Sequence, residues 1–417
     1  MKKIINFLFL LAVIFALGTS CKSKPSTTDE ETGGIRDIFA GAANVFVLMD
    51  DDSLWGAGYN RSDQFGMGES AGVPRISRIN DDTGAPFSGV KTVAAGENHT
   101  VILKEDGTLW GAGSSINGEL GQIDDNYLLF TGLKNGGAPV SGVKAVAAGN
   151  NSTFFIDENG SLWASGYNYY GELGLGNRNT QKTFSRVESA GQNIKAIAAG
   201  FRHTVILKEN GAVMAAGYNY NGQLGLGINA GGNTEDRDSF TEVRDMGSDV
   251  TAVAAGNYHT VILKSDGSVW TAGSNFCGQL GFADNTDRFN FTQVSDGNGS
   301  LLTGVREIAA RGNITVLLKS DGAMLLAGNF NDPSEPDYDA IVEEDGQGAG
   351  KSSFVPLVPE QGASVKFGEV RKIVLGYNSI YVITSDDHLW AAGSNRYGQL
   401  NLDLNTGMSP VLKLIEF

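Results

Sequence analysis

The stretch VTAVAAGNYHTVILKSDGSVWTAGSNFCGQLG, which runs from Val250 to Gly281, decides the fold because its pattern recurs seven times along the chain. Each copy has an apolar run ending in a glycine, two variable residues, a β-branched run, a turn and a second β run. These glycines, called anchors below, are Gly41, Gly96, Gly149, Gly200, Gly256 and Gly376, and Arg311 takes their place in the sixth copy. Self-similarity at a period between 51 residues (149 to 200) and 65 residues (311 to 376) indicates a repeat fold.

A large apolar residue follows each anchor at a constant distance, 14 residues from position 41 to position 55 and again from 256 to 270. The position holds Trp55, Trp110, Trp163, Met214, Trp270, Leu325 and Trp390, which include all five tryptophans of the chain. Three residues later every copy has a glycine. A large flat side chain at one place in each unit suits wedge-shaped units that pack around an axis.

The runs within each unit have the composition of β-strands. Thr260–Lys264 (TVILK) is β-branched and apolar on both faces, as a strand buried between layers must be. Asp266-Gly267 predicts a two-residue hairpin turn, and a further strand such as Phe184–Glu188 completes four strands per unit. We therefore predict an all-β fold, a seven-bladed β-propeller of four-stranded antiparallel blades over residues 35–417.

The two ends of the repeat region are expected to close the ring. The region begins with a first strand, Ile35–Ala40, and finishes with a fourth strand, Val411–Phe417. We predict that these N- and C-terminal strands pair, so that one blade is built from both ends.

Residues 1–20 have the layout of a secretory signal peptide, with Lys2 and Lys3 before the apolar run Ile4–Leu17. The run ends in Leu-Gly-Thr-Ser-Cys, which resembles a bacterial lipoprotein cleavage box with Cys21 as the lipidated residue. Residues 21–34 are polar and are expected to form a flexible tether. A lipid-anchored protein of the bacterial cell envelope, periplasmic or at the cell surface, is predicted.

The charge balance narrows the possible partners. The chain has 31 Lys and Arg against 47 Asp and Glu, a formal charge of −16. This argues against nucleic-acid binding and against electrostatic adsorption to anionic lipid, which leaves the lipid anchor as the membrane contact. Only Cys277 accompanies Cys21, so disulfides are not expected to hold the fold. We expect a monomer.

The motif Ala-Gly-x-x-His-Thr, then Asp-Gly, then Trp-x-x-Gly-x-Asn-x-x-Gly-Gln-Leu-Gly is similar to the regulator of chromosome condensation (RCC-type) repeat. The copies at 93–121, 146–174, 197–225 and 253–281 carry it well. The resemblance implies a seven-bladed propeller, but it leaves the function open. The family includes exchange factors for small GTPases, light sensors and secreted inhibitors of β-lactamase. This chain departs from the pattern at Arg311 and Ile314, at Asp63 and at Asn401.

The histidine, cysteine and acidic residues that could form a catalytic or metal site are each interpreted differently. His99, His203 and His259 occupy one repeat position, three residues after an anchor, and are interpreted as stabilising the turn of their own blade. Cys277 lies in a variable loop without a nucleophile's partners. The acidic stretch 332–345 lacks the spacing of a calcium loop and is either a solvated loop or a contact for a basic partner. We therefore expect no catalytic residue, no metal and no cofactor, and hence no enzyme.

Each unit has two variable pairs, one directly after the anchor and one in the Asn-x-x-Gly loop. The first and third strands, which lead to these pairs, run in the same direction, so both pairs are expected on the same rim. The residues predicted to bind a partner there are Tyr169, Tyr170, Phe201, Arg202, Tyr220, Tyr258, Phe276, Tyr377, Arg396 and Tyr397. Such residues form binding hot spots, although aromatic rings can also pack locally onto neighbouring loops. We predict a protein-binding scaffold. The alternatives are an inhibitor of a secreted or periplasmic enzyme, similar to the β-lactamase inhibitors, and a glycan-binding or glycan-acting protein. GTPase exchange is disfavoured because the signal places the chain outside the cytoplasm.

Overall fold

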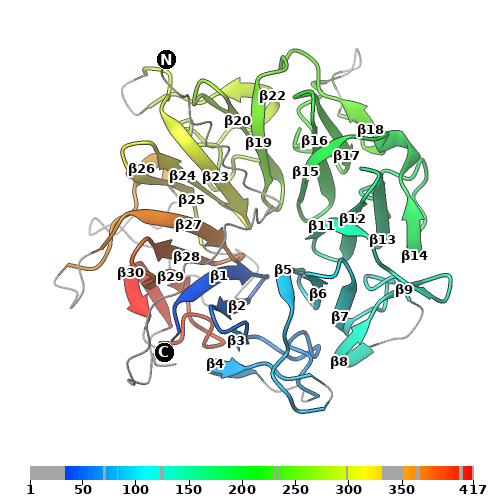
Figure 1. Cartoon of the computed structure of the whole chain (residues 1–417). Helices are drawn as coiled ribbons and strands as arrows, with labels where there is room; N and C mark the ends of the chain where they lie inside the picture. Colours follow the sequence, from blue (N-terminus) through cyan, green and yellow to red (C-terminus); the bar gives the residue numbers. More distant parts are fainter. Residues whose placement is uncertain are drawn as a thin grey trace, which may run out of the picture.

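Seven antiparallel sheets stand around a central axis in the computed structural model, and the first strand of each sheet lies nearest the axis (Figure 1). The structure describes residues 33–68, 72–81, 83–122, 126–228, 232, 234–296, 299–330, 351–361, 367–402 and 407–415. The predicted signal peptide, Cys21, most of the tether and the acidic stretch 332–345 lie outside these residues.

Each blade is built from four consecutive strands that pair in chain order. Blade 1 holds β1 (Ile35–Ala40), β2 (Asn44–Met49), β3 (Leu54–Gly58) and β4 (Val73–Arg78), and blade 2 holds β5 (Val90–Ala95), β6 (His99–Lys104), β7 (Leu109–Ser114) and β8 (Asn126–Gly132). Blade 3 holds β11 (Val143–Ala148), β12 (Ser152–Asp157), β13 (Leu162–Gly166) and β14 (Gln181–Arg186), and blade 4 holds β15 (Ile194–Ala199), β16 (His203–Lys208), β17 (Val213–Gly217) and β18 (Arg237–Glu242). Blade 5 holds β19 (Val250–Ala255), β20 (His259–Lys264), β21 (Val269–Gly273) and β22 (Arg288–Gln293). Blade 6 holds β23 (Val305–Arg311), β24 (Ile314–Lys319), β25 (Met324–Gly328) and β26 (Lys351–Pro356), and blade 7 holds β27 (Val370–Leu375), β28 (Ser379–Thr384), β29 (Leu389–Ser394) and β30 (Met408–Ile415). The prediction of seven four-stranded antiparallel blades is confirmed.

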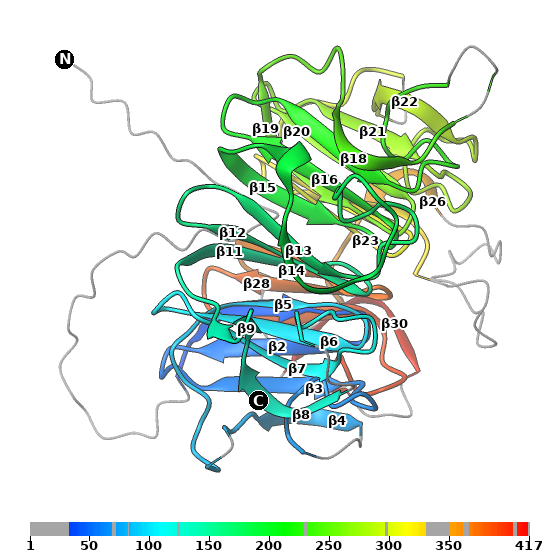
Figure 2. The ribbon, with the colours of Figure 1, turned by 90° about the vertical axis from the view of Figure 1, so that its right-hand side faces the viewer.

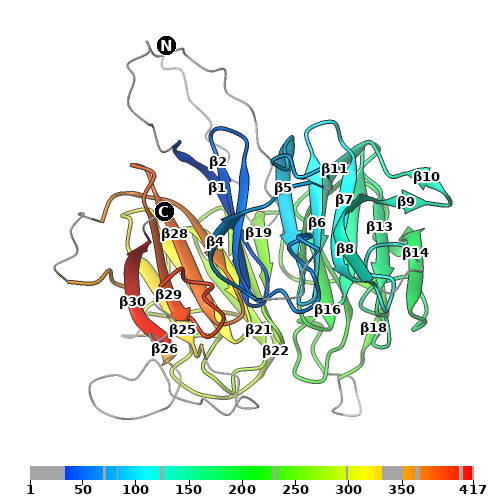
Figure 3. The same ribbon diagram turned by 90° about the horizontal axis from the view of Figure 1, so that it is seen from below.

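The described part of the chain has little regular structure outside the blades. A small hairpin of β9 (Lys134–Asn135) and β10 (Ala138–Pro139) lies in the linker from blade 2 to blade 3 (Figure 3). A single 3₁₀ turn, Glu188–Ala190, follows β14 among the described residues. Within the same residues, no helix has the length and apolar character needed to cross a membrane.

The turn between the second and third strands is longer than predicted. In blade 2 the amide of Gly107 donates to the carbonyl of Lys104 at 3.0 Å, and the amide of Lys104 donates to the carbonyl of Thr108 at 2.9 Å. Three residues therefore form the loop. Gly107 has φ 79°, whereas Asp106 does not enter the left-handed region. The expected two-residue turn is wrong, because this pattern is a type I turn followed by a glycine bulge.

The tryptophan position packs between blades, as the repeat predicts. Trp110 of blade 2 lies against a core that includes Phe46 and Phe87 from blade 1 and its linker. Trp163 of blade 3 lies in the same way against the core shared with blade 2, and Trp270 against the core shared with blade 4. Figure 2 shows inner strands of neighbouring blades, such as β11 and β15, side by side. Each blade therefore buries its apolar faces against its two neighbours, which an isolated blade could not do.

Ring closure differs from the prediction. Among the described strands, β1 pairs with β2 and β30 pairs with β29, so no described blade combines β1 with the C-terminal strand. The expected pairing of Ile35–Ala40 with the C-terminal strand is therefore wrong, although blades 1 and 7 do meet as neighbours. The physical reason is that each repeat already holds four strands in sequence, so every sheet is complete before the ring closes.

Polar contacts join blade 7 to blade 1 instead. The ammonium group of Lys372 pairs with the carboxylate of Asp37 and donates to the carbonyl of Ile38 at 3.0 Å. Arg371 donates to the carbonyl of Ile35, as Arg36 does to Val90 of blade 2 and as Arg306 does to Val370 of blade 7. At the anchor end, the amide of Tyr377 donates to the carbonyl of Ala42 at 2.9 Å. Closure thus uses hydrogen bonds of the kind that join other blade neighbours, with an added ion pair.

Candidate binding rim

The loop after the third strand is a rigid platform for its variable pair. In blade 5 the side-chain carbonyl of buried Asn275 accepts from the amide of Leu280 at 2.9 Å. The side-chain carbonyl of Gln279 accepts from the backbone amide of Cys277 at 2.9 Å. Equivalent pairs of bonds form in blades 3, 4 and 7. The repeat Asn-x-x-Gly-Gln-Leu-Gly therefore encodes a loop whose backbone is fixed and whose two variable side chains can differ.

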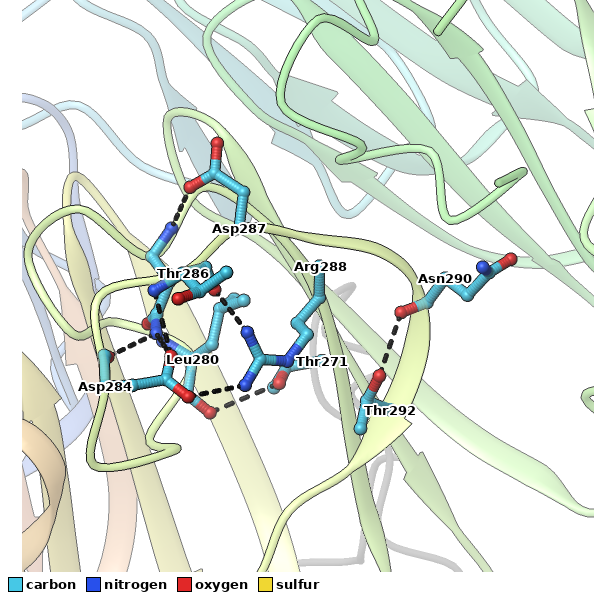
Figure 4. A network of polar contacts seen from close by, with 9 residues as sticks. Thr271, Leu280, Asp284, Thr286, Asp287, Arg288, Asn290 and Thr292 are labelled. Atoms are coloured by element: carbon cyan, nitrogen blue, oxygen red, sulfur yellow. Dashed lines mark hydrogen bonds and ion pairs between the residues drawn. The ribbon is translucent and has the colours of Figure 1, made fainter. Parts of the chain in front are cut away.

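A second polar network fixes the next loop of blade 5 (Figure 4). Asp284 accepts from the guanidinium of Arg288 at 2.7 Å and from the amide of Thr286 at 2.9 Å. Asp287 accepts from the amide of Asn275 at 2.8 Å, which links this loop to the one that carries Phe276. Both hydrogen-bond networks hold the loop that carries Phe276, whose side chain is 69% exposed.

Aromatic residues of blades 3, 4 and 5 meet in one group, called the rim cluster. Its members are Tyr167, Tyr169, Tyr170, Phe201, Arg202, Tyr218, Tyr220 and Tyr258. Tyr170 and Tyr218 meet edge to face at 4.9 Å between ring centroids, and Tyr218 meets Tyr258 at 6.1 Å. These contacts place first and second variable pairs from three blades on the same rim, as the strand directions predict.

Arg202 holds the centre of the rim cluster. Its guanidinium donates to the Tyr170 hydroxyl at 3.0 Å and lies 4.7 Å from the centroid of that ring. It also lies 4.9 Å from the ring of Phe201. A cation over an aromatic face is attracted by the ring quadrupole. The contact therefore fixes an arginine and two rings from adjacent blades before any partner arrives.

The exposure of the rim cluster is concentrated in two rings. Tyr169 is 62% exposed and Tyr220 is 71% exposed, whereas Tyr170, Phe201 and Tyr258 are half-buried. The half-buried rings support the exposed ones: Tyr169 packs edge to face on Tyr170 at 5.1 Å, and Tyr220 stacks on Tyr218 at 6.3 Å. Local packing and surface display, the two interpretations of these aromatic residues, therefore apply to different members.

A buried carboxyl group lies beneath the rim cluster. Glu172 occupies the glutamine position of the repeat and accepts from the amide of Tyr170 at 2.9 Å. Its backbone carbonyl accepts from the hydroxyl of Thr204 in blade 4 at 2.8 Å. Burial raises the pKa of Glu172 to about 7. The group holds the loop in place and lies out of contact with bulk solvent.

The remaining predicted binding residues lie elsewhere on the molecule. Tyr397 packs on Tyr59 of blade 1 at 5.1 Å, with the guanidinium of Arg396 5.7 Å from its ring. Tyr377 turns inward, and its hydroxyl donates to the side chain of Asn150 in blade 3. Burial raises the pKa of Tyr377. The predicted set thus divides into the rim cluster, the nearby Phe276, a smaller group on blades 7 and 1, and one residue in the channel mouth.

Sequence reasoning missed three tyrosines. Tyr59, Tyr167 and Tyr218 each follow the invariant glycine of the third strand and precede the buried asparagine. The pattern Gly-Tyr-Asn, visible at 58–60, 166–168 and 217–219, was the available signal. Each lies two residues before the variable pair of its loop. Tyr167 contacts the exposed Tyr169 and Tyr218 contacts the exposed Tyr220, whereas Tyr59 contacts the half-buried Tyr397.

The three repeat histidines do not act within their own blades. Nε2 of His99 lies 3.0 Å from the hydroxyl of Thr153, and Nε2 of His203 lies 3.0 Å from that of Thr260. Each bond reaches the next blade, so the prediction of a turn contact within one blade is wrong. The repeat fixes a residue's place in its unit but not the neighbour it faces. Among the described residues, no group of three or more His, Cys, Asp or Glu side chains is placed to hold a metal ion.

Comparison with known proteins identifies the family. The RCC1-like domain matches residues 80–334, more than half of the chain, and the RCC1 repeat matches residues 370–399. The chain belongs to the regulator of chromosome condensation family. The RCC1 match covers the anchors of blades 2 to 6 and returns in blade 7.

Curated relatives of this RCC1-family chain are similar over part of their length. The ultraviolet-B receptor UVR8 of Arabidopsis thaliana is 31% identical over 214 residues, which are 49% of this chain and 46% of the receptor. The X-linked retinitis pigmentosa GTPase regulator homolog of Caenorhabditis elegans is 24% identical over 348 residues, 74% of this chain and 24% of the relative. The chain spans less than half the length of these two relatives.

Two solved structures share the fold of this RCC1-family chain at low sequence identity. Prp20p from Saccharomyces cerevisiae has a TM-score of 0.69 at 19% identity, covering 93% of this chain and 87% of that one. Human WBSCR16 has a TM-score of 0.66 at 19% identity, covering 83% and 85%. At this identity the likeness establishes the propeller and leaves the binding surface to be argued from this chain's own residues.

Proposed function

We propose that this propeller is a non-catalytic binding module that captures a protein partner through the rim cluster. The observation that carries the proposal is the display of Tyr169 and Tyr220 on a preformed aromatic support. Exposed tyrosines beside an ordered arginine are the residue types that dominate binding energy at protein interfaces. Their loops are fixed by internal hydrogen bonds, so little conformational entropy is lost when a partner binds.

Two further observations support a protein partner. The chain carries a formal charge of −16, which favours a neutral or basic surface over nucleic acid. The structures of relatives include yeast RCC1 (Prp20) bound to Kap60, and Prp20p has been described with its binding to Gsp1p and histones. Those partners belong to the yeast protein, but they support the use of this fold as a protein-binding surface.

The location of the module is part of the same proposal. The pattern of residues 1–21 supports export and lipid attachment at Cys21, so that the rim cluster works in the bacterial cell envelope. A protein of the envelope is then the expected partner.

The test is capture of that partner by the rim cluster. Wild-type protein and a Tyr169→Ala/Tyr220→Ala variant are used to capture proteins from envelope extract, and the bound proteins are compared by quantitative mass spectrometry. The control variant replaces two exposed apolar residues away from the rim cluster, Leu301 (59% exposed) and Val358 (52% exposed), with alanine. A protein held by wild type and control but lost from the tyrosine variant supports the proposal. A captured set that is the same for all three proteins would reject it.

A further inference from the structure

The central channel of the propeller holds a cavity of about 210 Å³ lined by the innermost strands of all seven blades. Eleven of the 23 lining residues are alanines from the runs that precede the anchors. Ala148, Ala199 and Ala310 keep partial exposure even though they lie inside the ring, because they face this open space. The cavity is large enough to hold several water molecules.

Arg311 gives the cavity its unusual charge. It replaces the anchor glycine of blade 6, and in the same blade Ile314 replaces the histidine. In other blades those two positions depend on each other, because a Cβ at Gly96 or Gly256 would collide with the histidine ring. Loss of the imidazole in blade 6 therefore removes one of the two close contacts found there; the other is with a backbone carbonyl of the next blade, 2.7 Å from a Cβ at Gly96 and 2.8 Å from one at Gly256.

The guanidinium of Arg311 crosses the channel and is left with unused donors. Its Nη2 donates to the carbonyl of Ala95 in blade 2 at 2.9 Å, across the axis from β23 (Figure 1). Its Nε is buried and has no hydrogen-bond partner among the described residues. One face of the group is covered by Tyr377, whose ring centroid lies 5.1 Å away. A guanidinium has five N–H donors, and one protein acceptor does not satisfy them.

The charge of Arg311 is also unbalanced. Burial lowers its pKa, although arginine stays protonated at neutral pH. Glu97 exerts an attractive field on it, but no ion pair with Arg311 forms within the part of the chain that the structure describes. Arg311 is only partly exposed and lacks an adjacent counter-ion among the described residues, so an anion close to the guanidinium would stabilise its charge.

The other cation of the channel is already neutralised. Lys372 pairs with Asp37 and also donates to the carbonyl of Ile38 at 3.0 Å. Glu307, at the equivalent position of blade 6, accepts from the amide of Ile373 at 3.3 Å. Burial raises the pKa of Glu307 to about 7, so this carboxyl adds little negative charge below that pH. Of these two cations, Lys372 has an ion-pair partner among the described residues and Arg311 has none.

We propose that the channel binds a small oxyanion of the carboxylate or phosphate class at the guanidinium of Arg311. The planar fork of donors matches two oxygens of such a group, which a spherical halide cannot do. The small lining side chains leave space for the anion, and Tyr377 covers it on the side of the anchors. This site is separate from the rim cluster, so it stands or falls independently of the proposed protein partner.

The test uses the purified full chain titrated calorimetrically with phosphate, succinate and acetate at constant ionic strength. The Nε–H signal of Arg311 is followed in parallel by ¹⁵N-arginine NMR. We expect at least one of these probes to bind at millimolar concentration and to shift that signal, and Arg311→Gln to weaken its binding by about tenfold or more. Arg186→Gln, which removes an exposed arginine of blade 3, is the matched control and should bind like wild type. Comparison of phosphate with the two carboxylates distinguishes the two sources of the oxyanion.

Two outcomes would overturn the site. One is that no probe binds the wild type at tens of millimolar. The other is that Arg311→Gln binds as tightly as wild type, which would mean that Arg311 has only a structural role across the channel. If Arg311→Gln fails to fold, Arg311→Gly replaces it, because glycine is the residue at the other six anchors. Retained binding by a folded Arg311→Gly variant would contradict the proposal equally.

Discussion

Nε2 of His259 in blade 5 lies 2.9 Å from the hydroxyl oxygen of Thr315 in blade 6. The same hydroxyl donates to the backbone carbonyl of Gln279 at 2.7 Å. A threonine has one hydroxyl hydrogen, so the imidazole must be the donor in the first contact. His203 and Thr260 repeat the arrangement between blades 4 and 5. Two consecutive hydrogen bonds, from imidazole to hydroxyl and from hydroxyl to carbonyl, therefore link neighbouring blades.

Removal of the Thr315 hydroxyl should weaken the contact between blades 5 and 6. Thr315→Val keeps the shape of the side chain but leaves the His259 N–H and the Gln279 carbonyl buried without a partner. We expect the free energy of unfolding to fall by about 1–3 kcal/mol, measured by urea denaturation. Thr131→Val, at an exposed threonine, should change it by less than about 0.5 kcal/mol. Equal stability of Thr315→Val and wild type would show that the contact contributes nothing.

The histidines should make stability fall in acid. Burial lowers the pKa of His203 and His259 to about 3, and burial together with the charge of Arg311 lowers that of His99 to about 4. In the unfolded chain their pKa is near 6.5, so below pH 6.5 the unfolded state binds protons that the native state does not. Each histidine then costs up to about 1.4 kcal/mol of stability per pH unit until its folded pKa is reached. Denaturation of His259→Gln between pH 7 and pH 4 should show a shallower slope than wild type, and an unchanged slope would contradict the assignment.

Glu172 should affect the pH dependence of stability in the opposite direction. Its folded pKa of about 7 lies above the ordinary value of 4.5, so the native state keeps a proton that the unfolded chain has lost. Its contribution is present below pH 4.5 and is lost as pH rises through 7. Glu172→Gln, which installs the residue found at this position in blades 1, 4, 5 and 7, should therefore be more stable than wild type at pH 8 by up to roughly 3 kcal/mol. That advantage should vanish at pH 4, and a gain of the same size at both pH values would have another cause.

The ion pair between Lys372 and Asp37 should be important for closing the ring. Lys372→Met leaves a largely buried carboxylate unpaired, and we expect a loss of about 3–5 kcal/mol in thermal or urea unfolding. Lys372→Met combined with Asp37→Asn removes both charges and should recover much of this loss. Replacement of Arg186, whose pair with Glu188 is exposed, should cost less than about 1 kcal/mol. A Lys372→Met variant as stable as wild type would mean that packing alone closes the ring.

The lipid anchor is a prediction that needs its own test. Cells that express the chain are labelled with radioactive palmitate, and the protein is isolated from the membrane fraction. Label should enter the wild type and should be absent from Cys21→Ser, which should also leave the membrane fraction. Equal labelling of both proteins would exclude Cys21 as the lipidated residue.

The repeat predicts much of this fold because its periodicity fixes what happens inside a unit. The strand order, the tryptophan position and the rim that carries the variable pairs all follow from local spacing. Asp63 and Asn401, which break the glycine pattern, adopt φ of 60° and 53° and so keep the backbone that glycine adopts in other blades. Asn and Asp tolerate that region better than other side chains.

Relations between units were harder to predict. The spacing of His259 from its anchor does not reveal that Thr315 of the next blade is its partner. Nor does it reveal that four strands in sequence make a shared terminal blade unnecessary. Tyr377 fits the pattern of a rim residue, yet its ring packs on Arg311 and its hydroxyl donates to Asn150, so it points into the channel. These outcomes depend on three-dimensional neighbours that the repeat alignment does not contain.

Site-specific photocrosslinking tests the binding role of the rim cluster most directly. A photoreactive phenylalanine derivative is placed at Tyr220 in the cell envelope, and at exposed Leu301 as the control. We predict that irradiation joins a discrete protein to position 220 and not to position 301, and that Tyr169→Ala in the same chain reduces the yield. A crosslink of equal yield at both positions, or none at position 220, would contradict the account.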